Sequence, residues 1–496
     1  MPRRPKARDG LTAGERVRLY EAEQKAKAAQ LGGEAAQIKA DGSAPDVQPK
    51  MTEAPQRTKR QLPLPQHAVV SVDLSVKTGE INPMHGTVNG PVSYGADLSE
   101  LYREASIPAV LIDGCERGCA IDDIFGSWEA DPTSDGSYDF TVLDRSVAKA
   151  RAVGARVFIT LGFATDILSR EESQIPDIST DTLNRVCLKI VKRYYDGGLG
   201  GVDGFIVSDI CPRERLREVY SRISESVKLC GEEIRVGISL TRPLENDGKE
   251  LLKYCKRNHV PMDIITAKCF GEDVEEAAET VEGLSAYLKN LGLDETRILP
   301  VICYAPLSDT GVSSIPSLFS QACPPEARKR FFDKRRQTEG AAYLGAMALR
   351  LGDIDGVCGA FAYDMRPYST PWCPLTDAFG NKEKPFYVFR ELARLSRARA
   401  SALAISEQTP GMRHTGIYAK AAVGDSEAYC LLFSFGGCSV VDLRLDGIPD
   451  NLYSAEVYML DGVKNMTLAD TVPLSGMKKR LLLNVSSFGA IMVRLY

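Results

Sequence analysis

Residues 263–303 contain a strand–helix–strand unit. The run Asp263–Ala267 (DIITA) is short and apolar, and Val274–Leu291 (VEEAAETVEGLSAYLKNL) is a longer amphipathic stretch. A second short apolar run, Ile298–Cys303 (ILPVIC), follows it. Two apolar runs joined by a helical segment predict parallel strands with a helical crossover. This unit places the chain in the α/β class.

The same alternation extends over residues 68–400. Further strands are predicted at Ala109–Asp113, Arg156–Gly162, Gly204–Ser208, Arg235–Leu240, Val357–Tyr363 and near His85–Asn89. Further helices are predicted at Asp144–Val153, Thr182–Tyr195, Arg213–Leu229 and Arg328–Leu351. Eight strand–helix units in roughly 300 residues fit a (β/α)8 TIM barrel better than an open sheet. Because no glycine-rich phosphate loop follows a predicted strand, a nucleotide-binding fold is disfavoured.

The sequence patterns at the two ends of the chain differ from that of residues 68–400. Residues 1–66 are predicted to be an N-terminal extension, with one helix at Thr12–Gln30 and a flexible tether after it. Residues 67–400 are assigned to the barrel. Residues 401–496 contain short alternating runs separated by Gly, Asp and Asn, which is typical of an antiparallel β-sandwich. The N-terminal helix is either part of a disordered tail or a docking element for a protein partner.

The composition excludes several classes of protein. The 496 residues are 44% hydrophobic and 26% charged, with a formal net charge of -5. This balance is that of an ordinary globular protein and favours neither nucleic acid nor a membrane surface as a partner. Scattered cysteines and the lack of an apolar leader predict a cytoplasmic location. Since the four histidines lie far apart in the sequence, neither a metal nor an organic cofactor is expected.

Several blocks of the sequence resemble glycoside hydrolase family 39, which contains β-xylosidases and α-L-iduronidase. The blocks are Ile81–Val92 (INPMHGTVNGPV), Leu101–Val110 (LYREASIPAV), Ile124–Phe140 (IFGSWEADPTSDGSYDF), Phe158–Gly162 (FITLG), Phe361–Asp364 and Asp377–Leu392 (DAFGNKEKPFYVFREL). The similarity covers about residues 70–400. It implies a TIM barrel followed by a sandwich, with activity on O-glycosidic bonds.

The resemblance also implies where catalytic residues would lie, and there the sequence departs from the family. The family's Asn-Glu pair at the end of strand four corresponds to Ser208 and Asp209, so Asp209 would be the proton donor. The nucleophilic glutamate of strand seven corresponds to Tyr304. Hydrolysis of a glycosidic bond usually needs two carboxylates. A tyrosine nucleophile needs a neighbouring base, because its pKa is near 10; Asp364 or Asp166 would supply it.

Other polar and aromatic residues near the predicted strand ends would bind the substrate. Asp113 and Lys268 would contact sugar hydroxyls, and Arg366 would recognise an acidic sugar. Tyr368 and Trp372 would stack against sugar rings from the loop after strand eight. The full predicted binding set is Asp113, Asp166, Ser208, Lys268, Arg366, Tyr368 and Trp372.

Three functions remain open from the sequence. The first is a glycosidase in which Asp209, Tyr304 and Asp364 carry the chemistry. The second is a catalytically inactive barrel that binds an oligosaccharide or serves as an assembly partner. The third is a barrel with unrelated chemistry, such as a lyase or lactonase, in which Lys268 forms a Schiff base.

Overall fold

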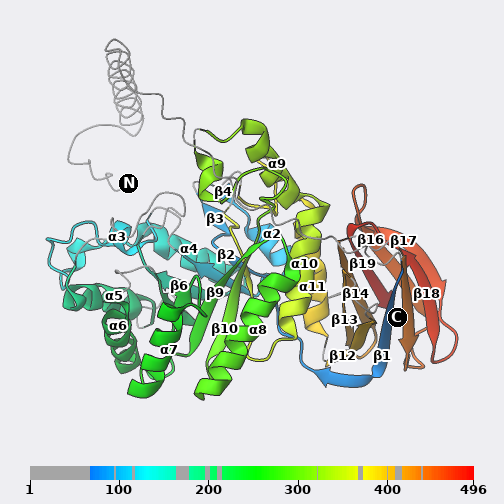
Figure 1. Ribbon diagram of the computed structural model, residues 1–496, viewed down its shortest axis with the longest axis horizontal. Coiled ribbons are helices and arrows are strands. Elements are labelled where there is room, and N and C mark those ends of the chain that lie inside the picture. Colours follow the sequence, from blue (N-terminus) through cyan, green and yellow to red (C-terminus); the bar gives the residue numbers. More distant parts are fainter. Residues whose placement is uncertain are drawn as a thin grey trace, which may run out of the picture. The chain divides into compact units, whose positions relative to one another are not determined.

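The computed structural model describes most of the chain after residue 66. The described residues are 67–93, 96–113, 118–163, 178–195, 201–208, 215–320, 322–366, 372–398, 400–407, 416–436 and 440–496 (Figure 1). The predicted extension 1–66, with its helix at Thr12–Gln30, lies outside these residues.

Eight parallel strands close into a barrel, which confirms the predicted fold class. Their order around the ring is β10-β11-β2-β5-β6-β7-β8-β9, and every neighbouring pair is parallel. The barrel strands are β2 (Gly86–Val88), β5 (Ala109–Ile112), β6 (Arg156–Leu161), β7 (Gly204–Val207), β8 (Arg235–Leu240), β9 (Ile264–Gly271), β10 (Arg297–Tyr304) and β11 (Phe361–Ala362).

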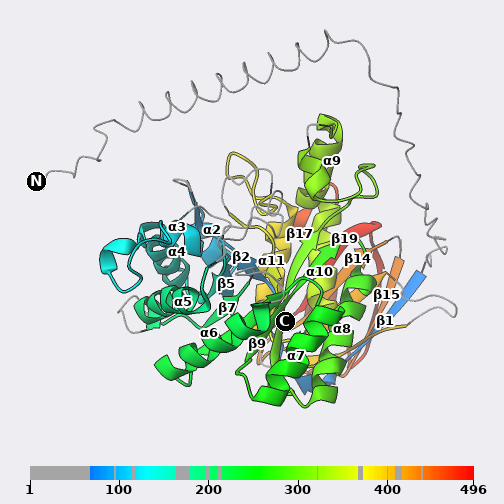
Figure 2. The ribbon, with the colours of Figure 1, turned by 60° about the vertical axis from the view of Figure 1, so that its left-hand side comes forward.

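Helices connect the strands, and most of them cover the outside of the barrel, whereas α9 (Pro325–Arg336) lies beyond the ends of the strands (Figure 2). They are α2 (Ser99–Glu104), α3 (Ile121–Ile124), α4 (Thr141–Ala152), α5 (Thr180–Tyr195), α6 (Leu216–Cys230), α7 (Asn246–Asn258), α8 (Val274–Leu291), α9 (Pro325–Arg336), α10 (Thr338–Gly352) and α11 (Lys384–Arg397). Two short 3₁₀ turns, η1 (Asp135–Ser137) and η4 (Pro316–Phe319), lie in loops.

The single helix predicted for Arg328–Leu351 is two helices. Helix α9 ends at Arg336, and Gln337 adopts extended backbone (ψ -171°) before α10 begins. At this corner a Cβ on Gly340 would lie 2.2 Å from the Arg335 carbonyl oxygen. The glycine therefore allows the two helices to meet tightly, whereas the hydrophobic pattern alone runs through the break.

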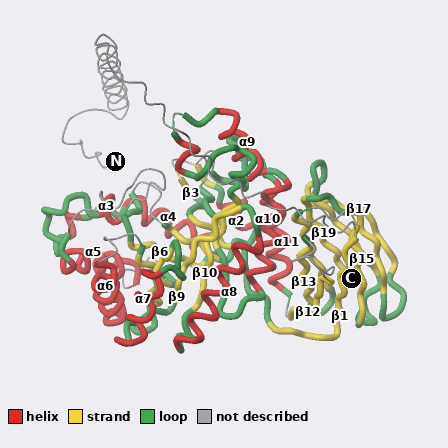
Figure 3. The backbone as a smooth tube through the Cα atoms, in the orientation of Figure 1, coloured by secondary structure: helices red, strands yellow, loops and turns green. Residues whose placement is uncertain are grey.

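Nine of the remaining strands form a mainly antiparallel sheet beyond α10 and α11 (Figure 3). Its order is β17-β16-β19-β14-β13-β12-β1-β15-β18. The strands are β1 (His67–Gly79), β12 (Ala400–Glu407), β13 (Ile417–Val423), β14 (Ala428–Phe435), β15 (Val440–Asp446), β16 (Ser454–Leu460), β17 (Asn465–Pro473), β18 (Lys479–Asn484) and β19 (Phe488–Leu495). A two-residue pair, β3 (Val92–Ser93) with β4 (Ala96–Asp97), completes the elements.

The predicted domain boundary at residue 67 needs a correction. Strand β1 lies in the nine-stranded sheet, antiparallel to β12 and parallel to β15. The barrel itself starts only with β2 at Gly86. The alternating burial of β1, in which Ala68, Val70 and Val72 are buried, suits a sheet with one face on a core.

The sheet packs on both of its faces. Side chains from β1, β15, β16 and β18, which lie toward opposite ends of the strand order, share one apolar core, as expected of a sandwich. The other face of β14, including Leu431 and Phe433, joins the core of the barrel helices. A Cβ on Gly345 of α10 would lie 2.2 Å from the ring of Phe433, so this helix and the sheet are in close contact.

Candidate functional site

The barrel wall separates two sets of side chains. One cluster, the barrel interior, contains Leu111, Ile206, Leu299, Val301 and Cys303 from strands around the ring. Their sequence neighbours belong to a second cluster that includes the surrounding helices. Because side chains alternate along a strand, this division tells which positions reach the barrel axis.

A small cavity lies at the carboxyl ends of the barrel strands, and we call it the barrel-mouth cavity. Its volume is about 40 Å³, which by this measure is space for roughly three water molecules. Residues from all eight strands or the positions just after them line it: Val88, Leu111, Asp113, Thr160, Ser208, Ser239, Thr266, Lys268, Phe270, Val301 and Tyr363. In TIM barrels this end of the strands carries the functional residues.

The lining of the barrel-mouth cavity is polar on one side. Strands β6, β8 and β9 contribute the hydroxyl groups of Thr160, Ser239 and Thr266, and Ser208 follows β7. Lys268 and Asp113 add a cation and a carboxylate. Hydroxyls both donate and accept hydrogen bonds, the ammonium donates and the carboxylate accepts. This combination suits a ligand that carries several hydroxyl groups.

Asp113 is joined to Asp364 through Asn89, the residue that follows β2. The Asn89 amide nitrogen donates to Asp113 Oδ1 at 2.9 Å and to Asp364 Oδ1 at 3.3 Å. The Asp113 N–H donates to Asn89 Oδ1 at 3.1 Å. Predicted residues Asp113 and Asp364 are therefore brought together, although Asp113 alone of the pair lines the cavity.

Asp364 is a buried anchor in the structure. Its side chain has no exposed surface. Arg366 donates to it from Nε at 2.7 Å and from the backbone N–H at 3.1 Å. Burial raises the pKa of Asp364, and the nearby Arg366 opposes that rise. The predicted role of Asp364 as the base that assists Tyr304 does not fit this enclosure, in which Arg366 donates both hydrogen bonds to the Asp364 carboxylate.

Tyr304 lies on the outer side of the barrel wall, which corrects its predicted place. Its hydroxyl donates to Glu339 of α10, and its ring centroid is 4.8 Å from that of Tyr343 and 6.0 Å from that of Phe435. Burial, with Glu339 beside it, raises the pKa of Tyr304 well above its usual value. The structure does not bring this phenol to the cavity or to Asp364, so we exclude it from the candidate site.

Trp372 is also buried, and so it is not the exposed rim residue that was expected. It is 9% exposed and packs edge-on against Phe331, Phe332 and Tyr363. The guanidinium of Arg335 lies 4.8 Å from the Trp372 ring centroid and donates to the Tyr363 carbonyl at 2.6 Å. These residues extend the interior apolar cluster from β10 and β11 up to α9.

Three predicted site residues, Asp166, Asp209 and Tyr368, lie outside the described residues. The predicted set lacks eight of the residues that line the cavity, among them Thr160, Ser239, Thr266 and Phe270, and it also lacks Asn89. The period-two alternation of each strand could have found the hydroxyls, because they occupy the same face as the interior apolar residues. Only the closed ring shows that they meet.

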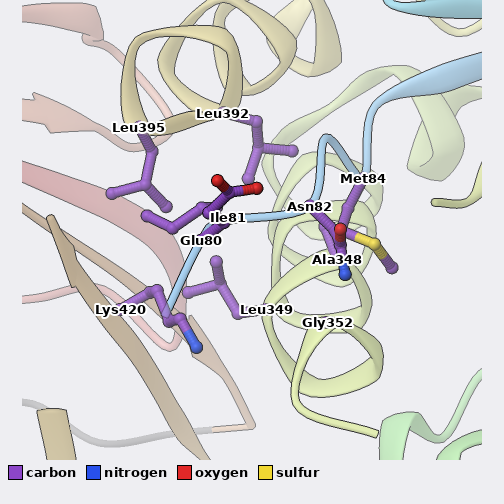
Figure 4. Close-up of a pocket in the computed structure, with 10 residues that line it drawn as sticks. All are labelled: Glu80, Ile81, Asn82, Met84, Ala348, Leu349, Gly352, Leu392, Leu395 and Lys420. Atoms are coloured by element: carbon purple, nitrogen blue, oxygen red, sulfur yellow. The ribbon is translucent and has the colours of Figure 1, made fainter. Parts of the chain in front are cut away.

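A second cavity, of about 30 Å³, lies between the chain entering the barrel, α10, α11 and β13 (Figure 4). Its lining is largely apolar, with Lys420 at the edge paired to Asp353. We read it as a packing gap between the barrel helices and the sheet.

The described part of the chain contains no cluster of three or more His, Cys, Asp or Glu side chains that could hold a metal ion. None of its helices is both long enough and apolar enough to cross a membrane.

Comparison with solved structures finds the same architecture in glycoside hydrolases. A glucosidase from Croceicoccus marinus is 16% identical with a TM-score of 0.67, covering 86% of this chain and 98% of its own. A family 30 endoxylanase from Clostridium papyrosolvens is 13% identical with a TM-score of 0.56, covering 86% and 99%. A family 51 α-L-arabinofuranosidase from Bifidobacterium longum is 11% identical with a TM-score of 0.56, covering 86% and 99%.

No family model and no curated protein matches the chain by sequence. The structural likenesses establish a barrel fold of the glycoside hydrolase type, and they do not single out family 39. At these identities the likeness is one of fold.

Proposed function

We propose that the chain binds a saccharide at the barrel mouth and does not hydrolyse it by the two-carboxylate mechanism. The observation that carries this proposal is the inward series of β10 and the residue after it, Leu299, Val301, Cys303 and Ala305, which is apolar throughout. In the described chain this strand presents no carboxylate to the barrel axis. In the two-carboxylate mechanism, both the retaining and the inverting reaction use a carboxylate pair that flanks the scissile bond.

Saccharide binding is supported by the lining of the barrel-mouth cavity. Sugar hydroxyls can pair with Thr266, Ser239 and the Lys268 ammonium, and they can donate to Asp113. The rings of Phe270 and Tyr363, with centroids 5.3 Å apart, supply an apolar edge. The cavity is small enough that it would take one or two ring substituents, with the rest of the saccharide above it.

The test combines binding and cleavage on one set of ligands. Purified protein is titrated with neutral and acidic oligosaccharides by calorimetry, and the same mixtures are assayed for newly formed reducing ends. We expect binding without cleavage.

The Lys268→Met variant identifies the binding site. It should bind at least about tenfold more weakly, because a hydrogen bond to a charged group contributes about 1.5–3 kcal/mol. Lys289→Met is the matched control, since Lys289 is half-exposed on α8 and paired with Asp355. Wild-type affinity in Lys268→Met, or turnover that Asp209→Asn abolishes, would reject the proposal.

A further inference from the structure

Asn89 holds an unusual backbone conformation beside the barrel-mouth cavity. It is 2% exposed and has a φ of 61°, in the left-handed region. Asparagine tolerates this region better than most residues, but the conformation persists only where its surroundings impose it. Here the Tyr102 hydroxyl donates to the Asn89 carbonyl at 3.1 Å, and the Asn89 N–H donates to the Leu111 carbonyl at 2.8 Å.

The turn after β2 leaves no room for a side chain at position 90. A Cβ on Gly90 would lie 2.1 Å from the Tyr102 hydroxyl, and Gly90 also has a positive φ of 84°. The backbone after β2 is therefore fixed from both sides, and the direction of the Asn89 side chain is fixed with it.

The Asn89 carboxamide uses both of its polar atoms to link three strand ends. Its nitrogen bridges Asp113 after β5 and Asp364 after β11, and its oxygen accepts from the Asp113 backbone. Asp364 is itself fixed by Arg366. A rigid chain of contacts thus runs from the end of β11 through Asn89 to Asp113, which borders the cavity.

We infer that Asn89 is a positioning residue that holds the Asp113 carboxylate in the wall of the barrel-mouth cavity, where it can accept a hydrogen bond from a hydroxyl of the ligand. This inference rests on the proposed function for the identity of the ligand. The hydrogen bonds that position Asp113 do not depend on the ligand, because all three join Asn89 to Asp113 or Asp364 within the protein. Binding sites depend on such support to keep their contacting groups in place.

Asn89→Gly is the variant of choice, because glycine adopts a positive φ without strain and the change removes the side chain with its carboxamide. Saccharide affinity should fall roughly tenfold, the effect of one hydrogen bond to a charged group. In an Asp113→Ala background the same change should have little further effect, since Asn89 acts through Asp113. Additive losses in the double variant would overturn the inference.

Asn82→Ala is the matched control. Its amide donates to the Val357 carbonyl at 3.0 Å, and Asn82 lies in the chain that enters the barrel before β2. It should lower thermal stability and leave saccharide affinity unchanged, which separates a structural from a positioning effect. A loss of affinity matching that of Asn89→Gly would contradict the inference.

A ligand-free readout separates this inference from the proposed function. In a crystal structure of Asn89→Gly, the Asp113 carboxylate should move by more than about 0.5 Å, the tolerance of a preorganised site. An unmoved carboxylate would overturn the positioning role, whatever the protein binds. Failure of the wild type to bind any saccharide would instead reject the proposed function, and the crystal structure would still decide the role of Asn89.

Discussion

Replacing Tyr304 by phenylalanine tests the orientation of β10 directly. The change removes the hydroxyl that donates to Glu339 and keeps the ring packed against Tyr343 and Phe435. Glu339 keeps its contact with Lys334 at 3.2 Å, so its charge stays partly compensated. We therefore expect the lower part of the range for a hydrogen bond to a charged group, about 1.5–2 kcal/mol of lost stability.

The assay is differential scanning calorimetry together with saccharide titration. Unfolding entropy of about 2 cal/mol/K per residue over roughly 430 residues gives about 1 °C per kcal/mol, so Tm should fall by about 2 °C. Saccharide affinity should not change, because the phenol lies outside the barrel wall.

Tyr343→Phe is the control for Tyr304→Phe. The Tyr343 hydroxyl is buried and has no hydrogen-bond partner, so its removal should be neutral or stabilising. Weaker binding in Tyr304→Phe with an unchanged Tm would refute the orientation of this strand.

Three further predictions concern stability. Burial lowers the pKa of His85 to about 4, so the neutral His85 side chain contributes fully to stability above pH 6.5, and this contribution is lost as the pH falls toward 4. In His85→Gln, the loss of unfolding free energy over this pH range should be smaller by about 3 kcal/mol, as measured by denaturant titrations. Gly345→Ala should cost about 1–3 kcal/mol through collision with Phe433, whereas Gly283→Ala, which meets only a flexible Leu244 methyl, should be neutral. Trp372→Ala should cost about 3–5 kcal/mol in the same titrations; a small loss would mean that Trp372 is not packed in the interior.

Most barrel elements were predictable because each carries its own local pattern. Strand β8 and helix α8 have the bounds predicted from the sequence, because each is a periodic run of apolar residues that ends where polar residues begin. Strand β11 is only two residues long, and so the apolar run Val357–Tyr363 predicts more strand than exists. The break at Gln337 was not visible because hydrophobic residues occur on both sides of it.

The place of β1 could not be derived from local pattern. Its partners, β12 and β15, are more than 300 residues away, and pairing over such a distance leaves no local signature. Order along the chain therefore suggested a barrel element for residues that complete the C-terminal sheet.

The sequence could predict only those site residues whose position depends on the end of a single strand. Asp113, Ser208 and Lys268 border the cavity, and each lies after or near the end of a strand. The prediction for Tyr304 was wrong because an alignment by resemblance does not tell which side chains of a strand face the barrel axis. A shift of one residue in register moves a side chain to the opposite face of the strand. Asn89 was missed because its role depends on contacts with two other strand ends.

Prolonged incubation of the wild-type protein with the oligosaccharide it binds most tightly, followed by quantification of new reducing ends, tests binding without hydrolysis most directly. We expect none above the protein-free control, because the inward positions of β10 from Leu299 onward, Leu299, Val301 and Cys303, carry no carboxylate. Sustained release that disappears in Asp209→Asn would contradict this expectation.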